Sequence, residues 1–354
     1  MLISMNIISL FAGCGGLDLG FRLAGFNPVW ANEYDRTIWD TYQFNHTDTL
    51  LDRRDIRKIN SDEIPDCIGI IGGPPCQSWS AAGAKRGIDD SRGQLFWDYI
   101  RIVRDKQPLF FLAENVSGIL SPRNRDAFTY ILSQFEQIGY RVSFKLLNAK
   151  NFGVPQDRKR VIVVGYRESL GFGFEFPEAG NEVLTLKDAI FDLQTAPIPV
   201  KGKVDNYHPS IPNHECADLG FSSIYMSRNR VRSWSEPSFT IQAGGRHAPI
   251  HPQASKMILV DKDKRIFDPN SPQPYRRLSV RECARIQTFP NKFIFKYKQI
   301  ADGYKMVGNA VPVNLARVFA SKIFEDIVIG HNASGITHRA ESIGQKALSV
   351  LSVI

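Results

Sequence analysis

Short apolar runs alternate with amphipathic stretches over the first half of the chain. The runs occur at 7–11, 28–31, 68–71, 109–113, 142–147 and 161–164. Between several of them, apolar residues recur at helical spacing, most clearly over 94–106 and 126–138. Strands that alternate with helices predict an α/β fold with a doubly wound, mostly parallel sheet.

After Tyr166 this alternation stops. Residues 171–177 are rich in glycine and phenylalanine, and 196–212 contain four prolines. Helical spacing returns near Asp302, and 315–328 carry an apolar stripe that predicts a helix packing back on the sheet. We therefore expect a sheet domain of residues 1–177 plus 303–330, a smaller irregular domain of 178–302, and a loosely ordered tail of 331–354.

Composition and charge limit the class of protein. Hydrophobic residues are 43% and charged residues 23% of the 354, as in ordinary globular proteins. The net charge of +8 suits a polyanion such as nucleic acid. The five cysteines are odd in number and lack CxxC spacing, which favours a reducing, cytoplasmic location and no metal. No apolar run reaches the roughly 18 residues of a membrane span, and the apolar start lacks the features of a signal peptide.

One loop combines turn-forming residues with a thiol. Gly72-Gly73-Pro74-Pro75-Cys76-Gln77-Ser78-Trp79-Ser80 follows the apolar run 67–71. Two glycines and two prolines exclude both helix and strand, so the chain must turn there. The carboxyl ends of parallel strands are where ligands bind, so Cys76 is a candidate nucleophile. The alternative is a small residue packed beneath a loop.

Acidic residues follow the first β segments. The turn Phe11-Ala12-Gly13-Cys14-Gly15-Gly16 ends the first run, although it is not GxGxxG. Glu33 follows the second, where an acid can accept both hydroxyls of a ribose. Asp55-Ile56 lie in the next connection, where they could reach an adenine edge. Each acid could instead be a solvated cap, but their joint placement favours an adenosine-type ligand.

Two further segments could complete an active site. Glu114, with Asn115 and Val116, closes the run 109–113, where burial favours its protonated form and donation to a ring nitrogen. Arg158 and Arg160 share one face of an extended segment, so one could hold a phosphate or a base carbonyl. A strand-end acid and a solvated basic edge are the alternatives.

The smaller domain contains a cluster of arginines. Arg228, Arg230, Arg232 and Arg246 face only one acid between residues 225 and 251, Glu236. Arginine reads guanine edges bidentately and also clamps phosphates. A basic surface without a ligand is the alternative for any single arginine.

Together these segments resemble the bacterial C5-cytosine-specific DNA methyltransferases. The resembling motifs span about residues 7–320 and occur in family order. They are FAGCGG, Glu33, Asp55-Ile56 (with Arg54 where the family often has glycine), GGPPCQSWS, Glu114-Asn115-Val116, Gln156 with Arg158 and Arg160, 276–290 (RRLSVRECARIQTFP), and Gly308-Asn309-Ala310-Val311 with Leu315.

The resemblance implies S-adenosyl-L-methionine as cofactor, double-stranded DNA as partner, and a target-recognition domain at 178–302. Cys76 would attack cytosine C6, Glu114 would donate to N3, Arg158 would hold O2, and Arg160 would support the loop or a phosphate. The cytosine would be flipped from the duplex. The motifs assign the cofactor to a set of thirteen residues: Phe11, Ala12, Gly13, Gly15, Gly16, Leu17, Glu33, Asp55, Ile56, Pro75, Leu95, Asn309 and Ala310.

The segment 226–232, with 241–243 and Arg246, further resembles methyltransferases that recognise GGCC. We expect a monomer on DNA that protects it from a partner restriction endonuclease. The alternatives are a tRNA cytosine-5 methyltransferase, which has less need of so long a recognition domain, and a nucleotide-dependent oxidoreductase, against which the missing GxGxxG counts.

Overall fold

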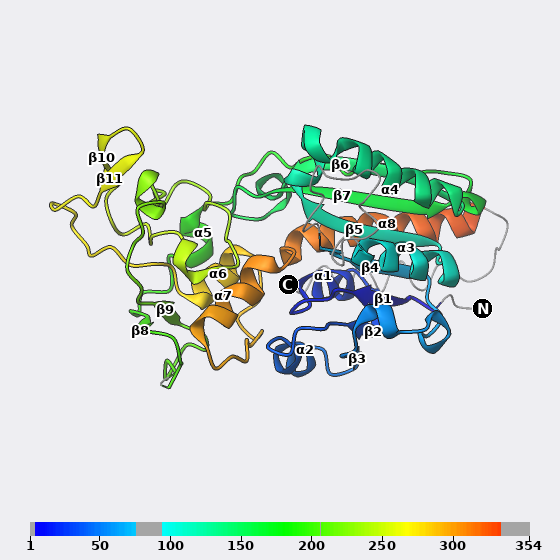
Figure 1. Cartoon of the computed structure of the whole chain (residues 1–354), viewed down its shortest axis with the longest axis horizontal. Helices are drawn as coiled ribbons and strands as arrows, with labels where there is room; N and C mark the ends of the chain where they lie inside the picture. The colour runs from blue at the N-terminus through cyan, green and yellow to red at the C-terminus, as the bar shows by residue number, and fades with distance from the viewer. Residues whose placement is uncertain (1–3, 76–93, 206, 334–354) are drawn as a thin grey trace.

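A seven-stranded sheet organises one part of the molecule, and a second group of short elements lies beside it (Figure 1). We describe the protein from a computed structural model, which describes residues 4–75, 94–205 and 207–333. The sheet order is β3-β2-β1-β4-β5-β7-β6. The strands are β1 (Asn6–Leu10), β2 (Asn27–Asn32), β3 (Leu50–Asp52), β4 (Gly69–Gly72), β5 (Phe110–Val116), β6 (Tyr140–Asn148) and β7 (Lys159–Arg167).

The first five strands in chain order run parallel, whereas β6 and β7 pair antiparallel at one edge. Strand order reverses between β1 and β4, which makes their carboxyl ends the switch point of a doubly wound sheet. The predicted fold class is therefore confirmed. Each predicted strand exists within a few residues of its expected bounds, but β3 was missed because three residues carry too little periodicity.

Helices cover both faces of the sheet, so its strands are apolar on both sides. Ile7 and Leu112 pack on one face with the helices α1 and α8. Ile8 and Phe111 pack on the other face with α3 and α4. The helices of this part are α1 (Gly16–Leu23), α2 (Trp39–Asn45), α3 (Gln94–Lys106), α4 (Arg125–Gln137) and α8 (Val313–Ala333).

Helix α8 brings the far end of the described chain back against the first helix. Gly20 makes this approach close, because a Cβ there would lie 2.4 Å from the Cβ of Ala316. The helix continues to Ala333, three residues into the segment expected as a tail, and residues 334–354 lie outside the described chain. None of the helices described is long and apolar enough to cross a bilayer.

The second group of elements is short and irregular, as its lack of periodicity indicates. Its two small sheets each hold two strands. Its elements are α5 (Leu186–Ile190), β8 (Ile198–Val200), β9 (Glu215–Ala217), β10 (Ile258–Asp261), β11 (Lys264–Ile266), α6 (Val280–Ile286) and α7 (Ile300–Asn309). Leu186, Cys283 and Tyr304 share a hydrophobic cluster, which also reaches Cys14 and Ile38 of the sheet part.

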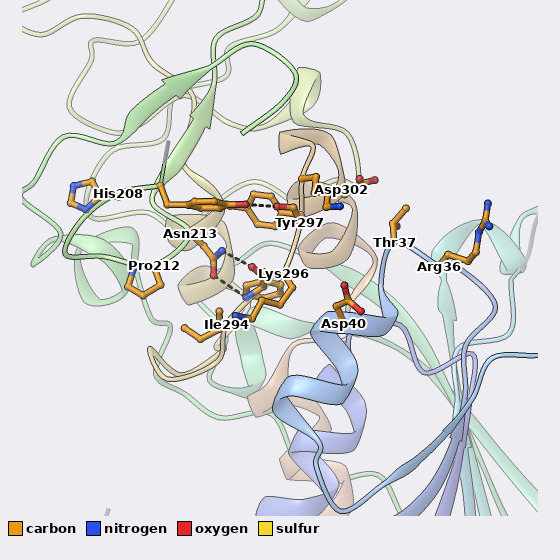
Figure 2. A pocket seen from close by; sticks show the side chains of 13 residues that line it. Arg36, Thr37, Asp40, His208, Pro212, Asn213, Ile294, Lys296, Tyr297 and Asp302 are labelled. Carbon is orange, nitrogen blue, oxygen red and sulfur yellow. Dashed lines mark hydrogen bonds between the residues drawn. The ribbon is translucent and has the colours of Figure 1, made fainter. Parts of the chain in front are cut away.

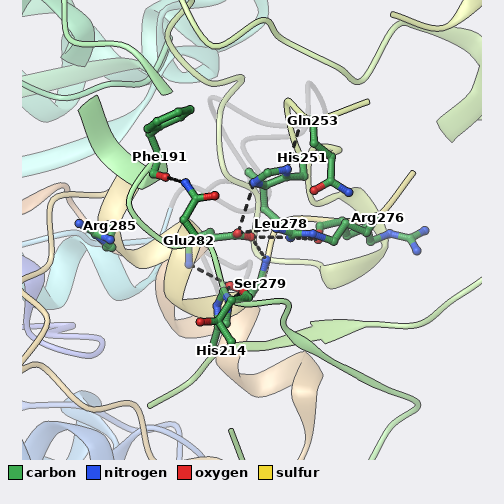
Figure 3. Close-up of polar contacts among 12 residues, drawn as sticks. Phe191, His214, His251, Gln253, Arg276, Leu278, Ser279, Glu282 and Arg285 are labelled. Atoms are coloured by element: carbon green, nitrogen blue, oxygen red, sulfur yellow. Dashed lines mark hydrogen bonds and ion pairs between the residues drawn. The ribbon is translucent and has the colours of Figure 1, made fainter. Parts of the chain in front are cut away.

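A buried ionic network holds the start of α6 in place (Figure 3). Glu282 is fully buried and accepts hydrogen bonds from both terminal nitrogens of Arg276, at 2.7 and 2.8 Å, and from the Ser279 backbone at 2.7 Å. Burial raises the pKa of Glu282, but the Arg276 hydrogen bonds outweigh this and leave it lowered. Burial also lowers the pKa of nearby His251 to about 4. This network explains how the buried Glu282 and its partner Arg276 are tolerated at the start of this helix.

Helix α2 contacts the second group through two side chains, each of which donates to and accepts from the backbone of one residue, as a neighbouring strand would. Thr41 Oγ1 donates to the Lys296 carbonyl at 3.2 Å and accepts from its amide at 2.8 Å. One turn later, Asn45 exchanges the same two bonds with Ile294 at 2.8 and 3.0 Å. Residues four apart on a helix share one face, so the pair matches alternate residues of the extended segment.

Candidate active site

A cavity of about 450 Å³ opens at the carboxyl ends of β1, β2, β4 and β5. This is the edge where the reversal of strand order leaves a crevice. Its walls come from distant parts of the chain, with the glycine turn after β1 facing the turn between α7 and α8. The lining residues are Ser9, Phe11, Ala12, Gly13, Gly16, Leu17, Glu33, Asp35, Ile38, 72–75, 114–116 and 309–311.

The glycine turn and Glu33 are joined directly. The Gly13 amide donates to Glu33 Oε2 at 2.9 Å, and the Asp35 amide donates to Oε1 at 2.7 Å. Burial raises the pKa of Glu33. Gly13 has a φ of 58° with open space beside it, and Gly15 has a φ of 86° with the His46 ring where a Cβ would lie. Glycine is therefore required at both positions.

Nine of the thirteen residues predicted to bind the cofactor line this cavity, and four do not. Gly15 is backed by His46, and Leu95 packs in the core on the α3 face. Asp55 forms an ion pair with Arg57, and Ile56 is buried in the same core as Leu95. The pairing of Arg57 with the Asp55 carboxylate was not predicted. The lining residues are Phe11, Ala12, Gly13, Gly16, Leu17, Glu33, Pro75, Asn309 and Ala310.

Several lining residues were not predicted. Ser9 comes from the interior of β1, and its hydroxyl donates to the buried Asp18 at 2.9 Å. Asp35 forms an ion pair with Lys305 of α7 at 2.8 Å, which joins the cavity wall to the second group of elements. Ile38 lines the cavity from the turn before α2. Its place follows from long-range packing, which periodicity does not report.

Glu114 and Arg160 form an ion pair at the cavity. Arg160 Nε lies 2.7 Å from Glu114 Oε1, and the side chains are 12% and 11% exposed. In the β5–β7 ladder, Glu114 lies opposite Ile162, two residues from Arg160. Diagonal neighbours on one face of an antiparallel pair are within reach of each other. The Glu114 carboxyl, which we expected among apolar strands, is therefore paired with a guanidinium.

The Arg158 side chain makes its hydrogen bonds to backbone carbonyls, contrary to the expectation that it holds a base carbonyl. Its side chain is 1% exposed and donates to the carbonyls of Ile241, Gly308 and Ala310 at 3.0, 3.0 and 3.1 Å. The alternation argument fails because β7 begins only at Lys159. The two side chains have different partners, because Arg158 donates to backbone carbonyls and Arg160 pairs with Glu114.

The candidate nucleophile follows directly from the cavity wall in sequence. Gly73, Pro74 and Pro75 line the cavity, and Cys76 is the next residue, outside the described chain. The Asn115 amide donates to the Pro74 carbonyl at 2.9 Å. A Cβ on Gly73 would lie 3.5 Å from Glu114 Oε2. The strand end that leads to Cys76 is thus fixed beside Glu114.

The four arginines of the smaller domain differ in their surroundings. Arg230 stacks on the Tyr225 ring and donates to the Tyr225 carbonyl at 2.9 Å. Arg232 stacks on a phenylalanine and pairs with Glu236 at 2.8 Å. Arg228 and Arg246 are exposed and have no hydrogen-bond or ion-pair partner within the described residues. The latter two are the arginines available to an external ligand.

A second cavity, of about 710 Å³, lies between α2 and residues 294–302 (Figure 2). Basic and acidic residues both line it, and they include Arg36, Asp40 and Lys296. The labelled Asn213 is already satisfied, because its side chain exchanges bonds of 2.8 and 2.9 Å with the Phe295 backbone. The cavity at the strand ends, with its buried ion pair and glycine turn, is therefore the candidate active site.

Comparison with known proteins gives the same assignment as the motifs. The family model for C-5 cytosine-specific DNA methylase matches residues 5–325. The Type II methyltransferase M.MthTI of Methanothermobacter thermautotrophicus is 58% identical over 92% of this chain and 98% of its own length. The Type II methyltransferase M.NgoPII of Neisseria gonorrhoeae is 52% identical over 90% and 95%.

Solved structures share the fold. A protein described as a DNA modification methyltransferase encoded within a prophage (E. coli) superposes with a TM-score of 0.70 at 25% identity, covering 91% of this chain and 99% of its own. The Spodoptera frugiperda DNMT2 structure gives 0.64 at 16% identity, covering 90% and 99%. The oxidoreductase alternative is excluded by the family match. The chain belongs to the C-5 cytosine-specific DNA methylases and is a DNA (cytosine-5-)-methyltransferase.

Proposed function

We propose that this enzyme methylates a flipped cytosine in duplex DNA through a covalent bond between Cys76 and C6. The observation that carries the proposal is the Glu114–Arg160 ion pair beside the strand end that leads to Cys76. A carboxyl and a guanidinium side by side can engage N3 and O2 of one pyrimidine, and we assign C6 to the thiol of Cys76, the residue that follows Pro75. Few other reactions need these three groups together.

S-adenosyl-L-methionine fits the cavity at the strand ends. The two oxygens of Glu33 each accept one backbone hydrogen bond and keep lone pairs for the hydroxyls of a ribose. Gly13 leaves open space where a side chain would stand. Phe11, Leu17 and Ile38 supply apolar wall, and Asn309 supplies a polar group opposite. When bound, the cofactor supplies an electrophilic methyl group.

The residues of the chain would act on the cytosine as follows. The Cys76 thiolate forms a bond with C6, which makes C5 nucleophilic enough to accept the methyl group. Glu114 donates to N3 as the ring gains electron density. Arg160, in place of Arg158, holds O2. The C5 proton then passes to water and leaves its electron pair in the C5–C6 double bond as the Cys76 sulfur leaves C6, and the proton on N3 returns to Glu114.

Access to both faces of the ring requires that the cytosine leave the base stack. Flipping costs a few kcal/mol, which contacts in the pocket offset. We assign target recognition to residues 178–302 and catalysis to 1–177 with 303–330. Arg228 and Arg246 would read or clamp the DNA, and the resemblance of 226–232 to GGCC-specific enzymes supports GGCC as target. We also propose a monomer in the cytoplasm that protects DNA from a partner endonuclease.

Trapping with a mechanism-based substrate tests the covalent step. The full chain is incubated with S-adenosyl-L-methionine and a GGCC duplex that carries 5-fluorocytosine, because fluorine at C5 prevents the elimination. A denaturant-resistant adduct that maps to Cys76 is expected with wild type and none with Cys76→Ser. Cys67→Ser is the matched control and should still form the adduct. Wild-type protein that binds this duplex without an adduct would refute the covalent scheme.

Bisulfite sequencing of DNA from a host that expresses the chain tests the target. Methylation confined to one cytosine of GGCC is expected. Methylation at another sequence would correct the target and leave the chemistry standing. Incorporation of labelled methyl into tRNA and none into duplex DNA would favour the tRNA alternative instead.

A further inference from the structure

Arg158 occupies a joint between the cofactor cavity and the arginine-bearing loop. Its guanidinium donates to Ile241 O on one side and to the Gly308 and Ala310 carbonyls on the other. Ala310 lines the cofactor cavity. Ile241 begins the segment that leads to the exposed Arg246. The buried Arg158 side chain therefore connects the wall of the cofactor cavity to the start of the loop that bears Arg246.

A second buried side chain reinforces the same joint. Gln156 accepts from the Ile241 amide at 3.0 Å and donates to Gln287 at 2.9 Å. Gln287 in turn donates to the Val307 carbonyl at 2.8 Å. The two backbone groups of Ile241 are thus both held by the segment 156–158. The end of α7 is held by the same segment, directly and through Gln287.

The two backbones that Arg158 joins are also in direct contact. A Cβ on Gly308 would lie 2.3 Å from the carbonyl carbon of Gln242 and 2.4 Å from the amide of Ala243. Any side chain at residue 308 would push these segments apart. Residues 308–310, which end at the cofactor cavity, and the 241–246 loop therefore cannot shift independently while these contacts are intact.

Arg158 has no carboxylate partner among the described residues, which is unusual for a buried cation. Its charge is balanced by carbonyl dipoles at the carboxyl end of α7, where cations are favourable. A lysine would keep the charge, but it lacks the planar fork that reaches two separate groups of carbonyls. The geometry of the joint therefore depends on arginine.

We propose that Arg158 is a positioning residue that couples cofactor binding to recognition of the DNA target. The inference rests on the proposed function and deepens it. When the bound cofactor restricts the motion of residues 308–310, the contacts of Arg158 and Gly308 also restrict the motion of the loop that bears Arg246. Coupling of this kind is reciprocal, so bound target DNA must tighten cofactor binding by the same factor.

Calorimetry on the full chain measures the coupling. The probe is S-adenosylhomocysteine, titrated with and without a saturating GGCC duplex, and the ratio of the two dissociation constants is the coupling factor. We expect a wild-type factor between about 5 and 150. Arg158→Lys and Gly308→Ala should bring it close to 1. The matched control Arg160→Lys should keep the wild-type factor although its kcat falls.

Kinetics separates positioning from a direct chemical role. Arg158→Lys should raise the KM for cofactor and for DNA and leave kcat within a few-fold of wild type, because the Glu114–Arg160 pair is untouched. A large loss of kcat with both KM values unchanged would instead restore Arg158 as a catalytic residue and overturn the proposal. So would a wild-type coupling factor in both folded variants.

Hydrogen exchange on wild type tests the joint even if both variants fail to fold. S-adenosylhomocysteine alone should slow amide exchange in residues 241–246, although these residues do not line the cofactor cavity. Unchanged exchange there, with slowed exchange at 11–17, would overturn the proposal. Failure of the proposed function would look different, since wild type would then form no adduct with the fluorinated duplex.

Discussion

The guanidinium of Arg160 lies 2.7 Å from the carboxylate of Glu114, which lines the cofactor cavity. Both side chains are nearly buried, so each is the other's partner before a base arrives. An incoming cytosine must therefore share a pair of groups that are already oriented. This arrangement reduces the reorganisation needed at the moment of reaction.

Removing one member of this pair should destabilise the fold more than removing both. Arg160→Gln leaves a buried carboxylate unpaired, at a cost of about 3–5 kcal/mol of unfolding free energy. The double variant Glu114→Gln/Arg160→Gln should recover part of that loss. Urea denaturation of the wild type, both single variants and the double variant gives the coupling energy. Strictly additive losses would mean that the ion pair contributes nothing.

Glu114→Gln should slow methyl transfer by about 10²–10⁴-fold, as expected for loss of a general acid. The amide is close in shape to the carboxyl but cannot transfer a proton to N3. Single-turnover transfer of labelled methyl to a GGCC duplex measures the chemical step. Glu168→Gln, at an exposed glutamate, is the control and should be unaffected. A rate within a few-fold of wild type would remove Glu114 from the mechanism.

Glu33→Gln should weaken cofactor binding by about tenfold to a hundredfold, because hydrogen bonds to a charged acceptor contribute about 1.5–3 kcal/mol. Asp55→Asn should change it by less than about threefold, since that carboxylate pairs with Arg57 and does not line the cavity. Calorimetry with S-adenosylhomocysteine compares the two directly. The reverse order of effects would show that Asp55 turns toward the cofactor.

Arg228→Ala and Arg246→Ala should each weaken binding to the GGCC duplex by about 1–3 kcal/mol if they read guanine. Arg232→Ala should act mainly on stability, because Arg232 already pairs with Glu236 and stacks on Phe239. Binding to target and unrelated duplexes at fixed salt separates the two outcomes. An equal loss on both duplexes would indicate phosphate contact without base reading.

Acid should weaken the arginine-bearing domain through Glu236. A backbone hydrogen bond from Ser233 and the Arg232 guanidinium lower the pKa of Glu236 to about 2. Its stabilising contribution is therefore complete above its ordinary pKa of about 4.5 and is lost as pH falls toward 2. Urea denaturation of wild type and Glu236→Gln should differ at pH 7, and the difference should shrink as pH falls from about 4.5 to about 2. A difference that is constant with pH would contradict the assignment.

The sheet and most of the cavity could be predicted from local pattern, because parallel strands bring their carboxyl ends to one edge whatever the loops do. The errors arose where the pairing of a side chain or the exact start of a strand decides the outcome. Arg158 follows the alternation rule only if β7 begins one residue earlier than Lys159. Asp55 stands where an adenine-reading acid would, but Arg57 occupies its carboxylate. Ser9 was missed because it lines the cavity from within an apolar strand.

The cavity has one wall near the amino end of the chain and another almost 300 residues later, at Asn309 and Val311. A ribosome therefore releases the strands and the glycine turn long before the opposite wall exists. A nascent chain cannot hold the cofactor until α7 has emerged and reached the sheet. Messages cut short before that point would yield products without methylating activity, so the host acquires this activity only from chains that extend past Val311.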